Sequence, residues 1–186
     1  AVLTQTGYHW RNDNDTEVDA ASATGGSENA SLGDVPRETP YRLRYQVDNE
    51  GGVSSPSTQY RLEYGTKITT CEEVGSWQRV ESGVAFEMAS TSQLIEGGDT
   101  TDVVSGGVSN PVGQTFLGTN GGQREETDTT GAITLTASQY VELEYAIQST
   151  DQSGFSTTYC FRLTNAGTPL PAYTEYAELT TREKLD

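Results

Sequence analysis

The chain has 186 residues, of which 27 are acidic and 11 basic, for a formal net charge of −16. This length suits one domain around a single buried core, and so acidic a surface repels nucleic acid and anionic membranes. The apolar runs are only a few residues long, well under the ~18–20 needed to cross a bilayer. We therefore expect neither a nucleic-acid partner nor a membrane span.

Residues 1–10 mix β-branched, aromatic and polar types, which predicts a half-buried strand over Val2–Trp10. No initiator methionine precedes this strand, so we expect an exported protein from which a signal peptide has been removed, located outside the cell or at its surface. The strand has two alternative roles: it pairs within its own sheet, or it completes the sheet of a neighbouring chain as a donor strand. The residues that would carry such strand exchange are Val2, Leu3, Thr4, Thr6, Tyr8 and Trp10.

An acidic stretch follows the first strand. Its four alternating carboxylates could supply the oxygen ligands of a calcium ion, although the spacing is not that of an EF-hand. These residues are Asp13, Asp15, Glu17 and Asp19. The alternative is a hydrated acidic turn. The same region contains two N-glycosylation sequons, at Asn14 and Asn29, which would lie in exposed loops.

Alternation of apolar and polar residues predicts further strands, most clearly at 41–47, 60–64 and 141–147. Weaker candidates are 84–88, 115–117, 132–136, 158–164 and 173–180. Arginines on the outer face of 41–47 and glutamates on that of 141–147 would form cross-strand pairs. We expect these to be surface pairs that contribute little individually.

Cys71 and Cys160 are the only cysteines. In an exported chain an even number indicates a disulfide, whereas in a cytosolic chain the two would be free buried thiols. A disulfide closing a loop of about ninety residues would stabilise the fold by roughly 4–5 kcal/mol in the chain-entropy model. A zinc site would need more Cys or His ligands than this chain has.

These strands and the distant cysteines predict an all-β fold, an antiparallel β-sandwich of the jelly-roll or Ig-like kind over residues 11–186. The region from about 89 to 130 is rich in Gly, Ser and Thr. We expect it to be an insertion of long loops that decorates one end of the sandwich.

Catalytic chemistry has little support in the sequence. His9 is the only histidine, and a lone histidine in a strand is usually structural. A glycosidase needs a pair of carboxylates, but the sequence does not distinguish Glu142/Glu144 or Glu125/Glu126 from ordinary solvated carboxylates. No glycine-rich loop has phosphate-binding spacing. We expect a protein that is not an enzyme and has no cofactor, unless calcium binds.

Several motifs together resemble β-sandwich modules that recur in bacterial secreted and cell-surface proteins. They are Gln5-Thr-Gly-Tyr-His-Trp-Arg-Asn-Asp13, Tyr41-Arg-Leu-Arg-Tyr45, Thr58-Gln-Tyr-Arg-Leu-Glu-Tyr64, Tyr159-Cys-Phe-Arg-Leu-Thr-Asn-Ala-Gly167 and Tyr173-Thr-Glu-Tyr-Ala-Glu178. The resemblance extends from about residue 4 to residue 180 and implies a surface module without a defined activity. Such modules usually occur in tandem, whereas this chain contains one.

The single module favours a subunit that assembles with copies of itself. We expect a structural subunit of an extracellular filament or pilus-like polymer, built head to tail by strand complementation. The alternative is an adhesin-like surface module that binds a glycan or a protein, for which Trp77 and the strand tyrosines would serve. A secreted hydrolase is the least favoured class.

Overall fold

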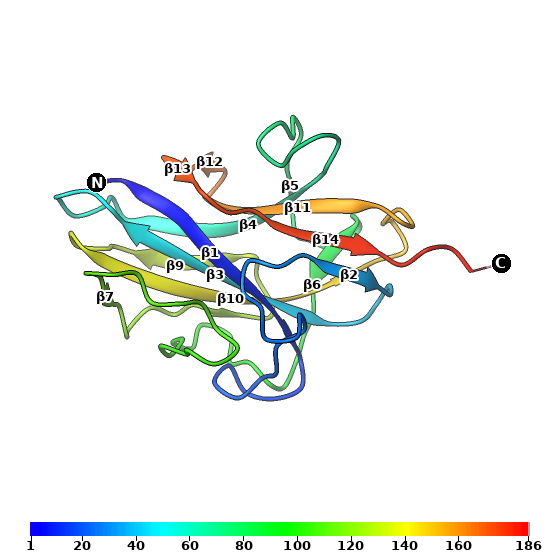
Figure 1. Ribbon diagram of the computed structural model, residues 1–186, viewed down its shortest axis with the longest axis horizontal. Coiled ribbons are helices and arrows are strands. Elements are labelled where there is room, and N and C mark those ends of the chain that lie inside the picture. Colours follow the sequence, from blue (N-terminus) through cyan, green and yellow to red (C-terminus); the bar gives the residue numbers. More distant parts are fainter. Residues whose placement is uncertain (186) are drawn as a thin grey trace.

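The computed structural model describes residues 1–185, and every regular element in that range is a β-strand. The strands form two seven-stranded sheets. In Figure 1, β4 (Thr58–Thr66) and β11 (Thr158–Asn165) lie above β3 (Tyr41–Asn49) and β10 (Gln139–Ser149). Side chains from both layers meet in a shared hydrophobic core.

The first sheet, sheet A, has the strand order β13-β1-β3-β10-β6, with β7 and β8 also paired to β10. Its further members are β1 (Leu3–Asn12), β6 (Phe86–Met88), β7 (Thr115–Phe116), β8 (Gln123–Arg124) and β13 (Ala172–Tyr173).

The second sheet, sheet B, has the order β2-β14-β11-β4-β5, with β12 on β11 and β9 on β4. Its further members are β2 (Leu32–Val35), β5 (Gln78–Arg79), β9 (Thr129–Ile133), β12 (Thr168–Pro169) and β14 (Ala177–Thr181).

Both sheets are mixed, so the prediction of purely antiparallel sheets is wrong. The long neighbours β1–β3, β3–β10 and β4–β11 are antiparallel. Parallel pairing occurs where a short strand lies along a long one, in β13–β1, β7–β10, β8–β10 and β2–β14. These short strands cover ladder groups that would otherwise be open to another chain.

The inward-facing residues follow the alternation read from the sequence. Leu43, Tyr45 and Val47 of β3 are completely buried in the core. An aromatic group joins the two sheets: the Trp10 and Phe161 rings are 5.4 Å apart in an edge-to-face arrangement, a geometry that aromatic pairs prefer. The Trp10 indole N–H donates a 3.0 Å hydrogen bond to the Glu178 carbonyl, so its polar atom is satisfied in the core.

The strands predicted from clear alternation are confirmed, and each is longer than its apolar run. Two weak predictions are displaced. The run 173–180 is divided into β13 and β14, and the strand expected at 132–136 is centred earlier, at Thr129–Ile133. The short strands β2, β5, β8 and β12 were not predicted, because two to four residues carry too little periodicity.

The predicted disulfide between Cys71 and Cys160 is confirmed, with the two Cα atoms 5.7 Å apart. It ties the loop after β4 to β11, and both half-cystines are buried. Trp77 and Tyr176 pack against it. The disulfide therefore secures the outer side of sheet B, away from the shared core.

Candidate functional site

A group of charged side chains lies buried on the outer face of sheet A. We call these residues the arginine–glutamate cluster: Arg11, Arg42, Arg44, Glu142 and Glu144. They alternate with core residues along β1, β3 and β10, so the strand pleat directs them away from the core. All five are 0% exposed. The expectation that these are surface pairs is therefore wrong.

Glu144 is the centre of the cluster. Its Oε1 accepts from Arg11 Nη1 at 2.6 Å and from Arg44 Nη1 at 3.1 Å, and its Oε2 accepts from Arg42 Nη1 at 2.9 Å. Three guanidinium groups thus converge on one carboxylate. Glu142 has a single arginine partner, Arg44 Nε, at 2.5 Å from its Oε1.

Two loop segments, residues 13–31 and 94–122, cover the arginine–glutamate cluster. From the first, the Glu17 carboxylate accepts from Arg44 Nη1 at 3.0 Å. From the second, the Thr100 hydroxyl donates to the Glu142 carbonyl at 2.6 Å. The Thr101 hydroxyl donates to Glu17 at 2.5 Å, which joins the two segments. The loop-rich insertion therefore lies over a face of sheet A, not at one end, because its polar groups satisfy the buried charges.

The charges of the cluster and its cover do not cancel. Three arginines form ion pairs with four carboxylates, two in the cluster together with Asp13 and Glu17. Burial raises the pKa of Glu142 to about 7, and its Oε2 has no hydrogen-bond partner within residues 1–185. With Glu142 protonated, three positive charges face three negative ones. In a poorly hydrated site this balanced arrangement has a lower free energy than three positive charges facing four negative ones.

The four carboxylates considered for calcium do not come together. Asp13 lies 3.3 Å from Arg42 Nε, and Glu17 is committed to Arg44. Asp15 accepts from the next backbone N–H, and Asp19 is exposed. Across residues 1–185, no three His, Cys, Asp or Glu side chains are grouped as metal ligands would be.

His9 bridges the two covering segments. Its Nδ1 lies 2.6 Å from the Gly107 carbonyl and its Nε2 lies 2.7 Å from the Ser22 hydroxyl. Burial lowers the pKa of the imidazole, so the ring is neutral at physiological pH and donates one hydrogen bond. Both ring nitrogens are occupied by loop contacts, which is a structural arrangement.

Of the carboxylate pair Glu125/Glu126, Glu125 has a structural partner: its Oε2 accepts a hydrogen bond from the Thr91 backbone N–H at 2.6 Å.

The residues considered for strand exchange lie in β1, within this chain's own sheet A, except for Val2, which precedes the strand. Leu3, Tyr8 and Trp10 are buried in the core, and Thr4 is buried as well. The remaining two residues are Thr6, half-buried, and Val2, which is 41% exposed. Strand β1 lies between β13 and β3 (Figure 1) and pairs with β3 along its whole length except for a bulge between Gln5 and Gly7.

The two sequon asparagines lie in the first covering segment and are exposed. Each side-chain amide nevertheless holds local structure. Asn14 Oδ1 accepts from the Ala21 N–H at 3.0 Å. Asn29 Oδ1 accepts from the Tyr8 backbone N–H at 2.9 Å. The Asn29 backbone N–H donates to the Tyr8 carbonyl at 2.8 Å. Asn29 thus covers the open edge of β1.

Trp77 is engaged by two neighbouring side chains. It stacks on Tyr176 with ring centroids 6.2 Å apart, and Tyr176 stacks on Tyr173 at 5.2 Å. The Arg162 guanidinium lies 4.4 Å from the Trp77 ring centroid. Trp77 and Tyr176 pack against the disulfide, so they stabilise the loop after β4.

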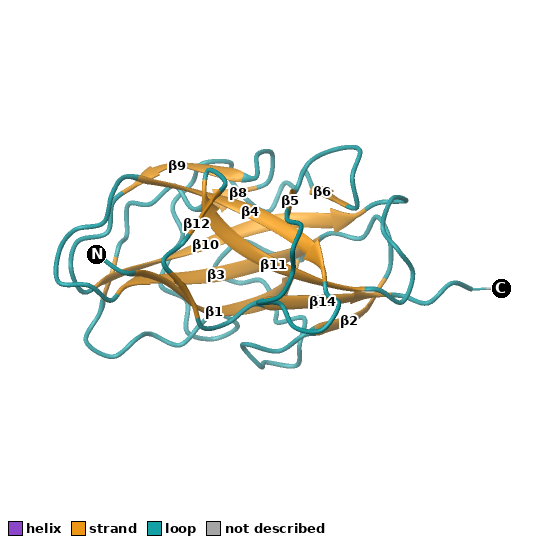
Figure 2. Ribbon diagram, turned by 90° about the horizontal axis from the view of Figure 1, so that it is seen from above, coloured by secondary structure: helices purple, strands orange, loops and turns teal. Residues whose placement is uncertain are grey.

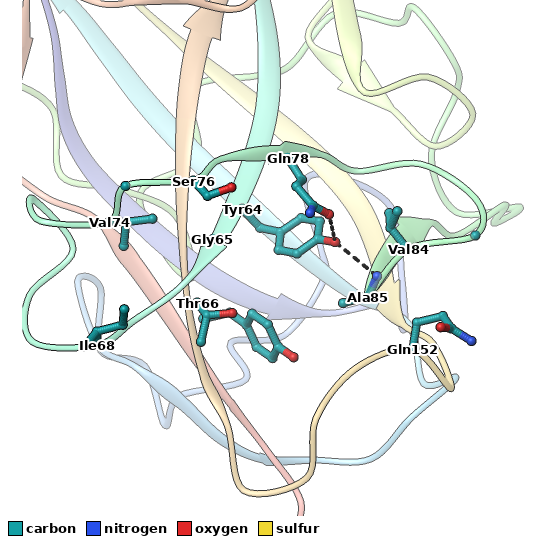
Figure 3. A pocket seen from close by; sticks show the side chains of 13 residues that line it. Tyr64, Gly65, Thr66, Ile68, Val74, Ser76, Gln78, Val84, Ala85 and Gln152 are labelled. Carbon is teal, nitrogen blue, oxygen red and sulfur yellow. Dashed lines mark hydrogen bonds between the residues drawn. The ribbon is translucent and has the colours of Figure 1, made fainter.

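A pocket of about 600 Å³ lies between the disulfide loop, the turn before β6 and the loop before β11. Figure 3 shows the Tyr64 hydroxyl at its inner wall, donating to Gln78 Oε1 at 2.9 Å and accepting from the Ala85 N–H at 3.0 Å. None of the lining residues is charged. We call it the neutral pocket. Sequence reasoning missed it because the pocket forms only where strand residues such as Tyr64 and Tyr159 meet loop residues that carry no motif.

No helix within residues 1–185 is long and apolar enough to cross a membrane. Comparisons of the chain with protein-family models, with curated proteins and with solved structures found no match.

Proposed function

We propose that the chain is a non-catalytic structural subunit of an extracellular filament, in which β1 of one copy completes sheet A of the next. On this proposal the fold is a β-sandwich of the jelly-roll or Ig-like kind, located outside the cell. The disulfide supports an oxidising location. The observation that carries the proposal is the position of β1, the first strand of the chain, between β13 and β3.

Withdrawal of β1 would open a groove suited to the same strand from another copy. It would expose the edge of β3 and the core face that Leu3, Tyr8 and Trp10 cover. Each such side chain contributes roughly 1.5–3 kcal/mol when buried, and an open ladder pairs readily with another strand. An incoming β1 would restore every one of these contacts.

The rest of the domain has cross-links that do not depend on β1. Arg44 joins β3 to both glutamates of β10, and the disulfide joins the loop after β4 to β11. These contacts would hold an acceptor subunit together while its groove is empty.

Cysteine pairing across β1 and β3 tests the proposal. Thr4 and Asp48 are register partners, so a T4C/D48C variant would form a disulfide at that position. Strand exchange predicts covalent ladders on a non-reducing gel after polymer assembly. The matched control is T158C/T180C. In the parent chain the hydroxyl oxygens of Thr158 in β11 and Thr180 in β14 are 2.7 Å apart, so cysteines at these positions would cross-link only within the chain. Ladders absent from the first variant would contradict strand exchange.

A second candidate function is favoured by the neutral pocket. Glycans are uncharged polar ligands in many cases, and the pocket has a suitable size with hydroxyl, amide and aromatic groups. An adhesin-like module would bind a neutral glycan there. Titration with neutral oligosaccharides, followed by amide chemical shifts, should then perturb Gln78, and Gln78→Ala should weaken binding. The control is Gln59→Ala, an exposed glutamine of β4 that does not line the pocket.

A further inference from the structure

Strand β1 has a bulge beside its neighbour β3. The two strands lie side by side in both views of the molecule (Figure 1 and Figure 2). Gln5 pairs with Val47 and Gly7 pairs with Gln46, so Thr6 has no register partner of its own. A bulge changes the direction in which a side chain points. The Thr6 side chain therefore lies between two residues of β3, not opposite a single one.

Thr6 contacts an amide and a carboxylate at the same time. Its Oγ1 lies 2.9 Å from Gln46 Oε1 and 3.0 Å from Asp48 Oδ1. Gln46 and Asp48 are two positions apart, so the strand pleat places both on the outer face of β3. Gln46 is 3% exposed and Asp48 is 4% exposed. A hydroxyl nucleophile, an acyl group and a base thus meet where water has little access.

The second covering segment, residues 94–122, fixes the orientation of the Gln46 amide. Gln46 Nε2 donates a 2.9 Å hydrogen bond to the Ser109 carbonyl. The amide oxygen is the atom that faces Thr6. Because each end of the amide has its own partner, the acyl carbon is held close to the Thr6 hydroxyl.

Asp48 has the properties of a general base. It lies within hydrogen-bond reach of the Thr6 hydroxyl proton, which is the first requirement. Burial raises the pKa of Asp48 to about 6, with a further contribution from the charge of Glu50, and the hydrogen bond from Thr6 offsets only part of this effect. A carboxylate with such a pKa is ionised at neutral pH and accepts a proton more readily than an ordinary aspartate.

The combination of the three groups distinguishes this site from other polar contacts. Within residues 1–185, the Tyr64 hydroxyl donates to Gln78 Oε1 at 2.9 Å, and the Thr136 hydroxyl lies 3.2 Å from Gln139 Oε1. Neither of these hydroxyls forms a hydrogen bond with a carboxylate in that part of the chain. Of the hydroxyl–glutamine pairs, only that of Thr6 therefore has a base in contact.

We propose that Thr6 and Gln46 form an ester cross-link between β1 and β3. Thr6 Oγ1 attacks the Gln46 acyl carbon, and the hydroxyl proton passes to Asp48. The carbon–nitrogen bond then breaks, and Asp48 returns the proton to the leaving nitrogen, which departs as ammonia. One carbon–oxygen bond forms and one carbon–nitrogen bond breaks, with no oxidant and no other reactant. Burial of the group then protects the ester from water.

The cross-link does not depend on the proposed filament. Where β1 belongs to the same chain, the ester closes a loop within that chain. Where β1 comes from a neighbouring copy, the same three side chains meet and the ester joins two subunits covalently. The T4C/D48C variant lacks Asp48, so its disulfides report on strand exchange alone.

The intact mass of the protein tests the ester, measured both on fresh and on stored material. The parent should be lighter than its disulfide-bonded sequence by one molecule of ammonia. Thr6→Val and Asp48→Asn should each keep their full sequence mass, whereas Thr6→Ser, which retains a hydroxyl, should lose ammonia. The matched control is Thr136→Val, which should lose ammonia as the parent does. A parent at its full sequence mass in both samples would overturn the proposal.

Digestion after arginine and lysine locates the bond. Thr6 falls in the peptide 1–11 and Gln46 in the peptide 45–61. The expected product is these two peptides joined, and hydroxylamine, which cleaves esters under conditions that leave amides intact, should separate them. Loss of ammonia confined to a succinimide at Asn120 before Gly121, or conversion of Gln46 to glutamate without joined peptides, would overturn the ester.

The outcomes separate this inference from strand exchange. Esters found only within single chains, together with purely intrachain T4C/D48C disulfides, would support the ester and overturn strand exchange. Multimers that resist reduction but separate in hydroxylamine would support both. Disulfide ladders of T4C/D48C, with a parent at its full sequence mass, would overturn the ester alone.

Discussion

Arg44 and Glu142 form a completely buried ion pair, Nε to Oε1 at 2.5 Å, on the side of sheet A that faces away from the hydrophobic core. The pair lies between two strands whose outer side chains are charged, beneath loops that come from distant parts of the sequence. It belongs to a network in which Glu144 binds three arginines. This arrangement makes the outer face of sheet A a second, polar core, with consequences for stability and for its dependence on pH.

Loss of Arg44 should destabilise the protein strongly. Arg44→Met would leave Glu17, Glu142 and Glu144 with fewer positive partners in a buried site, and breaking such a network costs about 3–5 kcal/mol. Urea unfolding followed by far-UV circular dichroism measures the change. Arg182→Met is the matched control, since its ion pair with Asp34 is exposed; it should change stability little. Equal effects of the two substitutions would contradict the buried network.

Glu142 should make the protein less stable as pH rises. Burial raises its pKa in the folded state from 4.5 to about 7, so between these values the folded protein keeps a proton that the unfolded chain has released. The free energy of unfolding therefore decreases with pH across this interval. Asp48, with a pKa raised by burial from 3.8 to about 6, contributes in the same direction.

Substitution separates the contribution of Glu142. Glu142→Gln is neutral at every pH and can still accept a hydrogen bond from Arg44, so the thermal midpoint should fall less between about pH 4.5 and about pH 7 than in the parent. Asp48→Asn reports the smaller contribution of Asp48. A parent midpoint that rises through this interval, with the same slope in Glu142→Gln, would show that Glu142 is charged in the folded state.

The disulfide should contribute substantially to stability. Cys71 and Cys160 are 89 positions apart, and removal of a native disulfide typically costs about 2–5 kcal/mol. The double variant Cys71→Ser/Cys160→Ser should unfold at a lower urea concentration. Its tryptophan emission should shift to longer wavelength through Trp77, which packs on the disulfide. Trp77→Phe in the same background should abolish the shift, because Trp10 is buried in the shared core.

Calcium should leave stability unchanged. Asp13 and Glu17 are engaged by Arg42 and Arg44, so a cation would have to displace buried guanidinium groups to reach them. We expect equal thermal midpoints with excess calcium and with a chelator. An increase in the midpoint with calcium that Asp13→Asn abolishes would restore the calcium hypothesis.

Much of the framework can be predicted from local patterns. Apolar residues alternate at 41–47, 60–64 and 141–147, and this period alone assigns strands and their core faces. The even number of cysteines predicts a disulfide on the expectation that the chain is exported. Most short edge strands cannot be predicted in this way, because β5, β8 and β12 contain two residues each and form only where a loop meets the edge of a long strand.

The sequence by itself determined that β3 carries arginines and β10 carries glutamates on the faces opposite their core residues. Only the tertiary structure decided that this face is buried. The segments 13–31 and 94–122 have no periodic pattern, and their position depends on contacts such as Glu17 with Arg44 and His9 with Gly107. From sequence alone, polar residues are expected to be solvated. Loops that supply enough hydrogen-bond partners can nevertheless exclude water from them. The burial of charge is thus a property of long-range contacts, which local alternation does not encode.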